Sequence, residues 1–85
     1  MTNILTAKQI RNARLLARIT QEQLAMEARV PLHILKNIET GRISLNRVYA
    51  AAIRIALEGY GVKFMSGDQV QFKPAHVGMS PYSWD

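Results

Sequence analysis

Side chains that could bind nucleic-acid bases recur at four-residue spacing between residues 32 and 37. Leu32 and Lys36 are four residues apart, as are His33 and Asn37, so all four cluster on one side if the segment is helical. The Asn37 amide can form two hydrogen bonds with adenine, and the Lys36 ammonium group can donate to guanine. The His33 imidazole can donate or accept, depending on its tautomer. This pattern predicts a helix face that can read base edges, on which Leu32 would touch a thymine methyl group.

Two of these side chains also have interpretations that need no ligand. His33 can be an ordinary exposed histidine, and Leu32 can be partly buried in the protein core. The helix that carries them is expected from Leu32 to Glu39, because Leu35 and Ile38 supply buried positions one turn apart.

The preceding helix should hold this face in place. Thr20 and Gln23 form a T-x-x-Q capping box, so a second helix is expected to begin after Thr20. Leu24, Ala25 and Ala28 should face inward, and the small Ala25 lets the two helices approach closely. Further along the chain, Gly41 fits the left-handed position that ends many helices.

The first helix is expected from Ala7 to about Arg18, with Thr6 as its N-cap. Its apolar positions recur near the helical period, which predicts a stripe facing the core. The members of this stripe are Ile10, Ala13, Leu15 in part, Leu16 and Ala17.

A fourth, longer helix is expected from about Asn46 to Glu58 or Tyr60, with Ser44 and Asn46 as competing caps. Gly59 and Gly61 should bring it to an end. Its apolar residues are too widespread for one stripe, so two faces are expected, with two partners. The predicted core face is Val48, Ala52, Ile55 and Ala56, and the second face is Tyr49, Ile53, Leu57 and Tyr60.

The period changes from 3.6 to 2 after Gly61. Two short alternating runs, VKFM and VQFK, flank Ser66-Gly67-Asp68 and predict a β-hairpin over residues 62–73. Residues 74–85 begin with Pro74 and show no period, which favours an irregular tail. Tyr82 and Trp84 leave open that the tail docks on its own surface or on a partner's.

Composition limits the class of protein. The chain has 85 residues and a net charge of +5, with no cysteine. We therefore expect one soluble domain without disulfides, and an anionic partner. Residues 1–47 hold eight basic and three acidic residues, so the whole excess charge lies there. A solvated basic surface would explain this equally well. No apolar run is long enough to span a membrane and MTNILTAKQI lacks a signal-peptide pattern, so we expect a cytoplasmic protein.

The sequence offers little support for catalysis. It has no G-x-G-x-x-G and no G-K-[ST] phosphate-binding loop. His33 and His76 lie in unrelated segments, so no metal site is expected. Ser80 and Ser83 lie near His76 in a segment with no scaffold to orient a triad. We expect neither enzymatic activity nor a cofactor.

The stretch IRNARLLARITQEQLAMEARVPLHILKNIETGR resembles the helix-turn-helix domain of phage-repressor-like regulators of the Cro/C1, xenobiotic-response-element type. The resemblance extends over about residues 5–57 and depends on an arginine in the first helix, TQEQLA and IETG. It implies a mainly α fold, a lambda-repressor-like helix-turn-helix bundle of about four helices in residues 1–61. The hairpin of residues 62–73 would pack on the same domain, and residues 74–85 would follow as the tail.

The resemblance also implies roles for particular residues. Arg14 and Glu39 match the positions of an ion pair that links the first helix to the end of the third. Gln21 and Arg42 match phosphate-contacting positions, with Arg47 as a weaker candidate. The base-reading positions would be Leu32, His33 and Asn37, and Lys36 lies on the same side, where it could reach a base or a phosphate.

Two residues depart from the family pattern. Arg29 stands where the turn commonly has glycine, so it would be strained by about 1 kcal/mol if that position needs positive φ. Pro31 stands where a capping Ser or Thr is common, and it has no capping oxygen. The third helix could therefore start later than Leu32 and shift the base-reading register by one residue.

These features predict a sequence-specific regulator, expected to be a repressor, that binds double-stranded DNA as a homodimer. The alternative is an antitoxin or adaptor that binds a partner protein through the fourth helix, the hairpin or the tail. RNA binding is a third option, but the chain lacks the aromatic platform expected on a sheet.

Overall fold

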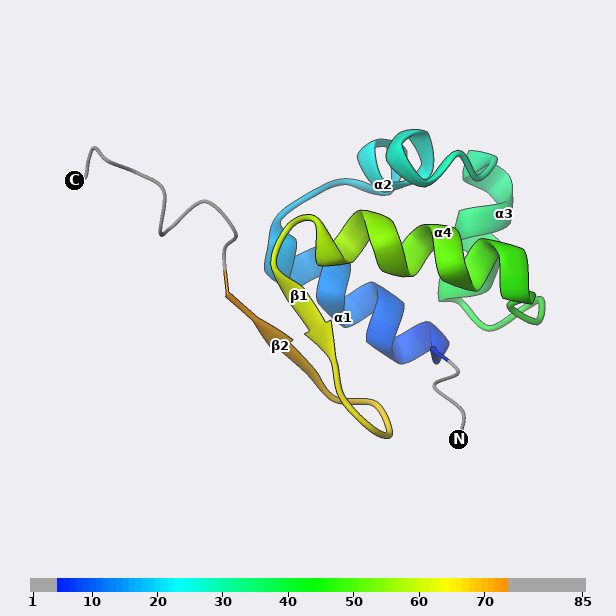
Figure 1. The fold of residues 1–85 in the computed structure, drawn as a ribbon. Coiled ribbons are helices and arrows are strands. Elements are labelled where there is room, and N and C mark those ends of the chain that lie inside the picture. The colour runs from blue at the N-terminus through cyan, green and yellow to red at the C-terminus, as the bar shows by residue number, and fades with distance from the viewer. Residues whose placement is uncertain (1–4, 74–85) are drawn as a thin grey trace.

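The computed structural model describes residues 5–73, which form four helices followed by a small antiparallel hairpin (Figure 1). The mainly helical architecture predicted from the sequence is confirmed. The elements are α1 (Ala7–Ala17), α2 (Gln21–Ala28), α3 (Leu32–Glu39), α4 (Arg47–Glu58), β1 (Val62–Phe64) and β2 (Val70–Phe72).

Side-chain caps explain where three of the helices begin. Thr6 accepts a hydrogen bond from the Gln9 backbone N–H, and Thr20 accepts one from Gln23, so both helices start with a reciprocal capping box. The box at Thr6 was not predicted, although the sequence T-x-x-Q is the same. Of the two competing caps for α4, Asn46 is the one that accepts from its first turn.

The core lies where the four helices meet. The fully buried side chains come from every helix and include Ile10, Leu24, Leu35, Ile38, Ile53 and Leu57. Helix α2 packs against both α3 and α4, and α1 packs against α3, α4 and the hairpin. Leu24, Ala25 and Ala28 are buried as predicted, and so are Leu35 and Ile38.

The predicted core face of α4 is wrong for Val48 and Ile55, which are 73% and 69% exposed. Ile53 and Leu57 are buried instead, and Tyr49 and Tyr60 lie half-buried against them. The reason is geometric, because positions 49, 52, 53, 56, 57 and 60 form one continuous helical stripe that takes residues from both predicted faces.

The predicted stripe of α1 is correct at Ile10 and Ala13 but wrong at Leu16. Leu16 is 43% exposed and Leu15 is 53% exposed, while the polar Gln9 is buried. The hairpin packs against α1, and it covers the Gln9 side of the helix rather than these leucines.

The hairpin pairs Val62 with Phe72 and Phe64 with Val70. Val62 is buried, the three other apolar strand residues are half-buried, and Lys63 and Gln71 are exposed, so the predicted alternation is confirmed. The Arg54 guanidinium of α4 lies 5.8 Å from the centre of the Phe64 ring, and this adds a contact between α4 and β1. The predicted tail lies outside the described residues.

Backbone conformation accounts for the sharp connections. Gly41 has φ 78°, as its predicted role requires. Arg29 has φ 57°, so it adopts the left-handed backbone conformation that is unfavourable for arginine. Arg18 adopts the same conformation at φ 59°. Pro31 provides no side-chain cap, yet α3 begins at Leu32 without the shift that Pro31 suggested.

Candidate nucleic-acid interface

Helices α2 and α3 are joined by three residues, Arg29 to Pro31, and they pack directly against each other. Val30 in this connection is buried, and its N–H donates to the Ala25 carbonyl over 2.9 Å. The connection is therefore anchored to the core, and it fixes the direction in which α3 leaves α2. In Figure 1, α3 lies at the opposite end of the molecule from the hairpin.

The four predicted base-reading residues lie on α3 with unequal exposure. His33 and Lys36 are exposed, whereas Leu32 and Asn37 are half-buried. Leu32 packs against the core, which agrees with the ordinary interpretation of this residue. Among residues 5–73, the side chains of His33, Lys36 and Asn37 have no hydrogen-bond partner, so their polar atoms are free to bind a ligand.

A buried ion pair holds α3 against α1. The Arg14 Nε donates to Glu39 Oε2 over 2.8 Å, and a second guanidinium nitrogen donates to Glu39 Oε1 over 3.1 Å. A third bond, from Arg14 Nη1 to the Ile19 carbonyl, joins the pair to the segment before α2. This bidentate geometry is the strong form of an arginine–carboxylate pair. It joins α1, the α1–α2 connection and the last turn of α3.

Gln21 takes part in the same cluster. Its Nε2 donates to Glu39 Oε1 over 3.1 Å, so one of its two amide N–H groups is engaged inside the protein. The sequence suggested only a phosphate contact for this residue. The structure gives Gln21 an additional bond that ties the start of α2 to the end of α3, and leaves its second N–H for an outside acceptor.

Arg42 and Arg47 lie on either side of the loop between α3 and α4. Both are exposed, and among the described residues neither forms an ion pair. Arg47 is the first helical residue of α4 and Arg42 follows Gly41 at the end of α3. The two guanidinium groups therefore flank the loop that follows the candidate base-reading helix.

One further hydrogen bond ties α2 to the residues that follow α4. The Tyr60 hydroxyl donates to Glu27 Oε2 over 2.7 Å. This bond to a carboxylate, with smaller effects of burial and of the Glu27 charge, raises the pKa of Tyr60 above its ordinary value of 10.0. No local pattern in the sequence predicts this bond, because the two residues are 33 positions apart.

Metal binding gains no support from residues 5–73, which contain no group of three or more His, Asp or Glu side chains arranged around a common point. His76, Ser80 and Ser83 lie outside the described residues. None of the four described helices has the length and apolar character of a membrane span.

No protein-family model matches the chain, and no curated protein matches it either.

Proposed function

We propose that the protein is a helix-turn-helix regulator that binds specific sequences of double-stranded DNA as a homodimer and acts as a repressor. In this proposal α2 and α3 are the two helices of the motif, and α3 enters the major groove. The observation that carries it is the outward face of α3, which presents unpartnered polar side chains on a helix fixed by the buried Arg14–Glu39 pair.

Each side chain of this face has a chemical role in the proposal. Asn37 would pair with adenine and Lys36 would donate to guanine or to a phosphate, while His33 would donate or accept at a base edge. Leu32 would contact a thymine methyl group only with the part of its side chain that the core leaves uncovered. Good contacts of this kind supply about 1–3 kcal/mol of discrimination each.

The phosphate contacts in the proposal come from residues around this face. Arg42 and Arg47 would neutralise phosphates on one side of the groove, and Gln21 would donate its remaining N–H at the start of α2. The excess of positive charge in residues 1–47 supports the same assignment.

Binding-site selection with the purified protein and genomic fragments tests the proposal. A regulator of this kind enriches one sequence motif, and its affinity for the selected site falls steeply as salt rises from about 50 to 200 mM, because bound phosphates release counterions. A protein that enriches no motif, or whose affinity for its best fragment is unchanged over this salt range, would refute the proposal.

A second function is favoured by one observation, the exposed apolar residues Val48 and Ile55 on α4. An adaptor or antitoxin would use such a face to hold a partner protein. Purification from the native host separates the two functions. A stoichiometric partner that dissociates when Ile55 is changed to Glu would support the adaptor, whereas a protein that purifies alone and shifts DNA would not.

A further inference from the structure

The outer edge of β2 is unpaired within the described part of the chain. The Met65 N–H donates to the Gln69 carbonyl and the Lys73 N–H donates to the Gly61 carbonyl, each over 2.9 Å. With the register of the hairpin, these bonds turn the backbone groups of Gln71 toward β1 and those of Val70 and Phe72 outward. No residue in 5–73 bonds to these outward groups. An unpaired strand edge is a template for another strand.

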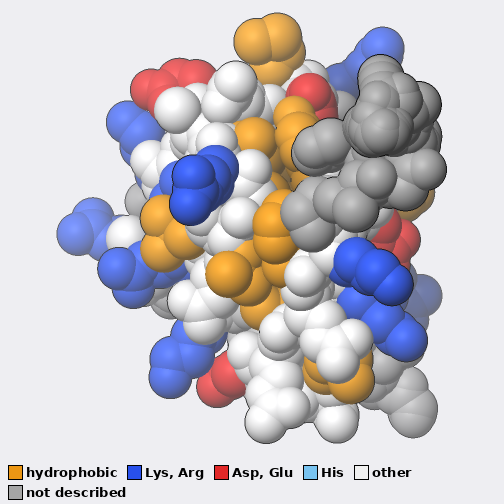
Figure 2. Space-filling view, turned by 90° about the vertical axis from the view of Figure 1, so that its left-hand side faces the viewer, with side chains coloured by type: hydrophobic (Ala, Val, Ile, Leu, Met, Phe, Trp, Pro, Cys, Tyr) orange, Lys and Arg blue, Asp and Glu red, His pale blue; other side chains and the backbone are white. Residues whose placement is uncertain are grey.

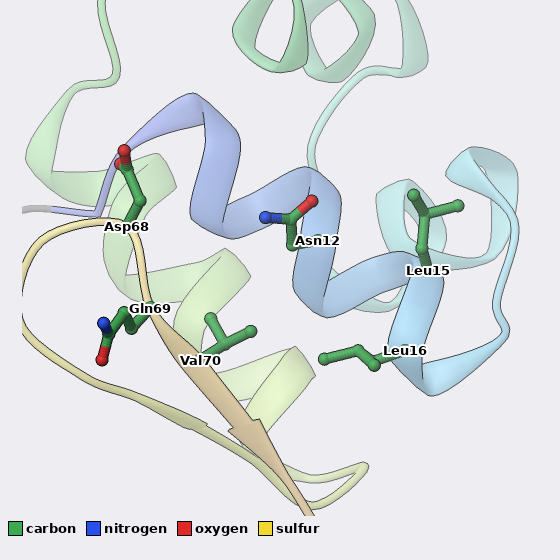
Figure 3. Close-up of a pocket in the computed structure, with 6 residues that line it drawn as sticks. All are labelled: Asn12, Leu15, Leu16, Asp68, Gln69 and Val70. Carbon is green, nitrogen blue, oxygen red and sulfur yellow. The ribbon is translucent and has the colours of Figure 1, made fainter.

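A groove with apolar lining residues lies beside this edge. Leu16 projects from α1 toward Val70, and Leu15 precedes it on the same helix; with Asn12, Asp68 and Gln69 these residues line an open groove of about 530 Å³ (Figure 3). Figure 2 views the hairpin side of the molecule and shows hydrophobic side chains gathered along its middle, with Lys and Arg at both margins. A strand added to β2 would therefore cover apolar surface as well as form backbone hydrogen bonds.

We propose that a second copy of this chain occupies the edge, with its own β2 paired antiparallel to the first around a two-fold axis. Val70 of each copy would then form the hydrogen-bonded pair with Phe72 of the other, and the two Gln71 residues would face each other at the axis. The pairing joins two hairpins into one four-stranded sheet, and it rests on the homodimer of the proposed function.

The chemistry of β2 fits a second copy of itself. In this register Gln69 of one copy lies opposite Lys73 of the other, so an exposed amide and an exposed ammonium group face each other on each side of the axis. The outward backbone groups also match themselves under the two-fold rotation, as an isologous contact requires. Leu16 of each copy would lie below the joined sheet, which accounts for its exposure in one copy.

Cysteine cross-linking tests this arrangement directly, because the native chain has no cysteine. Facing residues of a non-hydrogen-bonded pair have Cα atoms about 4.5 Å apart, within the roughly 4.4–6.8 Å that a disulfide spans. We expect Gln71→Cys to form a disulfide-linked dimer on mild oxidation without DNA. Lys63→Cys is the matched control, since its position is three strand spacings, about 14 Å, from its counterpart. Ala51→Cys probes the exposed face of α4.

Efficient cross-linking at position 71 but not at 63 or 51 supports the proposal. Cross-linking at Ala51→Cys alone would assign the dimer to α4 and overturn it, as would equal, slow cross-linking at all three positions. Because no DNA is present, this result is independent of whether α3 binds DNA.

Sedimentation equilibrium provides a second measurement that involves no oxidation. Leu16→Lys places a charge in the apolar groove beside β2. We expect the dissociation constant of the dimer to rise roughly 100-fold while the far-ultraviolet circular dichroism is unchanged. Val48→Lys is the matched control on α4 and should leave the dimer intact. A dimer that resists Leu16→Lys but dissociates with Val48→Lys would contradict the proposal.

Discussion

Two polar side chains are buried in the described structure, and they stabilise opposite regions of the molecule. Glu39 is 8% exposed and fixes α3, whereas Gln9 is 2% exposed and fixes the hairpin. Glu39 is charged and accepts from Arg14 and Gln21. Gln9 is neutral; its Nε2 donates to the Met65 and Gln69 carbonyls over 2.7 and 3.0 Å, and its Oε1 accepts from the Thr6 N–H.

The region proposed to bind DNA and the region proposed to dimerise therefore depend on different polar contacts. Removing the partner of a buried charge leaves that charge stranded, whereas removing a neutral amide leaves unsatisfied carbonyls, which is less costly. Both contacts start from α1, on residues five positions apart. Variants at these positions should therefore separate the two proposed activities.

The largest effect is expected for Arg14→Met. It strands the Glu39 carboxylate and should lower the free energy of unfolding by about 3–5 kcal/mol, measured by urea denaturation. The exposed Arg11 on the same helix is the matched control, and Arg11→Met should change stability by less than about 0.5 kcal/mol. Adding Glu39→Leu to Arg14→Met should restore part of the loss. A further loss in the double variant would contradict the stranded-charge explanation.

Gln9→Ala should have the next largest effect, a loss of about 1–3 kcal/mol, because two hairpin carbonyls lose their donor. Gln23→Ala removes the same residue from the second capping box, where the side chain is exposed, and should cost about 0.5 kcal/mol. At temperatures where Gln9→Ala remains folded, it should weaken self-association more than DNA binding by one subunit. Equal unfolding free energies for the two variants would mean that Gln9 does not anchor the hairpin.

A smaller effect on stability is expected in each region from the two arginines whose backbone is in the left-handed conformation. Arg18 ends α1, which carries the hairpin, and Arg29 ends α2, which precedes α3. Glycine adopts this conformation without the side-chain penalty, so Arg18→Gly and Arg29→Gly should each raise the unfolding free energy by about 1 kcal/mol. Alanine at the same positions serves as the control, since it keeps the penalty. Stabilisation by alanine as large as that by glycine would show that the backbone conformation is not the cause.

The smallest effect concerns the bond that ties α2 to the end of α4. Because the folded pKa of Tyr60 is raised, its hydroxyl stabilises the fold fully below pH 10.0 and less as the pH rises through the folded pKa. Absorbance titration of phenolate, with Tyr60→Phe as the reference, should assign to Tyr60 an ionisation at a pH above the ordinary value for tyrosine. Glu27→Gln should lower the pKa of Tyr60, since it removes the carboxylate acceptor and its charge. An unchanged titration would contradict the Glu27 contact.

Local signals in the sequence predicted much of the fold. The Thr20 capping box, the Gly41 helix end and the alternation around Gly67 are features of a few neighbouring residues, and the structure contains each of them. The same is true of α3, whose predicted bounds, Leu32 to Glu39, are those observed.

The features that the sequence did not predict depend on contacts between distant segments. The burial of Gln9 depends on the hairpin turn, more than 50 residues away. Apolar residues occur on nearly every side of α4, so periodicity alone could not decide between Ile53 and Ile55 as the core residue. The Gln21–Glu39 bond likewise requires the packing of α2 on α3. For the candidate site, the sequence predicted which residues of α3 face outward to DNA, which remains a prediction, and the structure added the contacts that hold this helix.

The central claim is that the outward face of α3 reads bases, and a comparison of two alanine variants tests it most directly. Asn37→Ala and Lys63→Ala are each titrated against the selected site and against a scrambled duplex at equal salt. Asn37→Ala should reduce the ratio of the two affinities by about 5- to 150-fold, equivalent to the loss of about 1–3 kcal/mol, and Lys63→Ala should leave it unchanged. If Asn37→Ala weakens binding to both duplexes equally, or leaves both affinities unchanged, α3 does not read DNA as proposed.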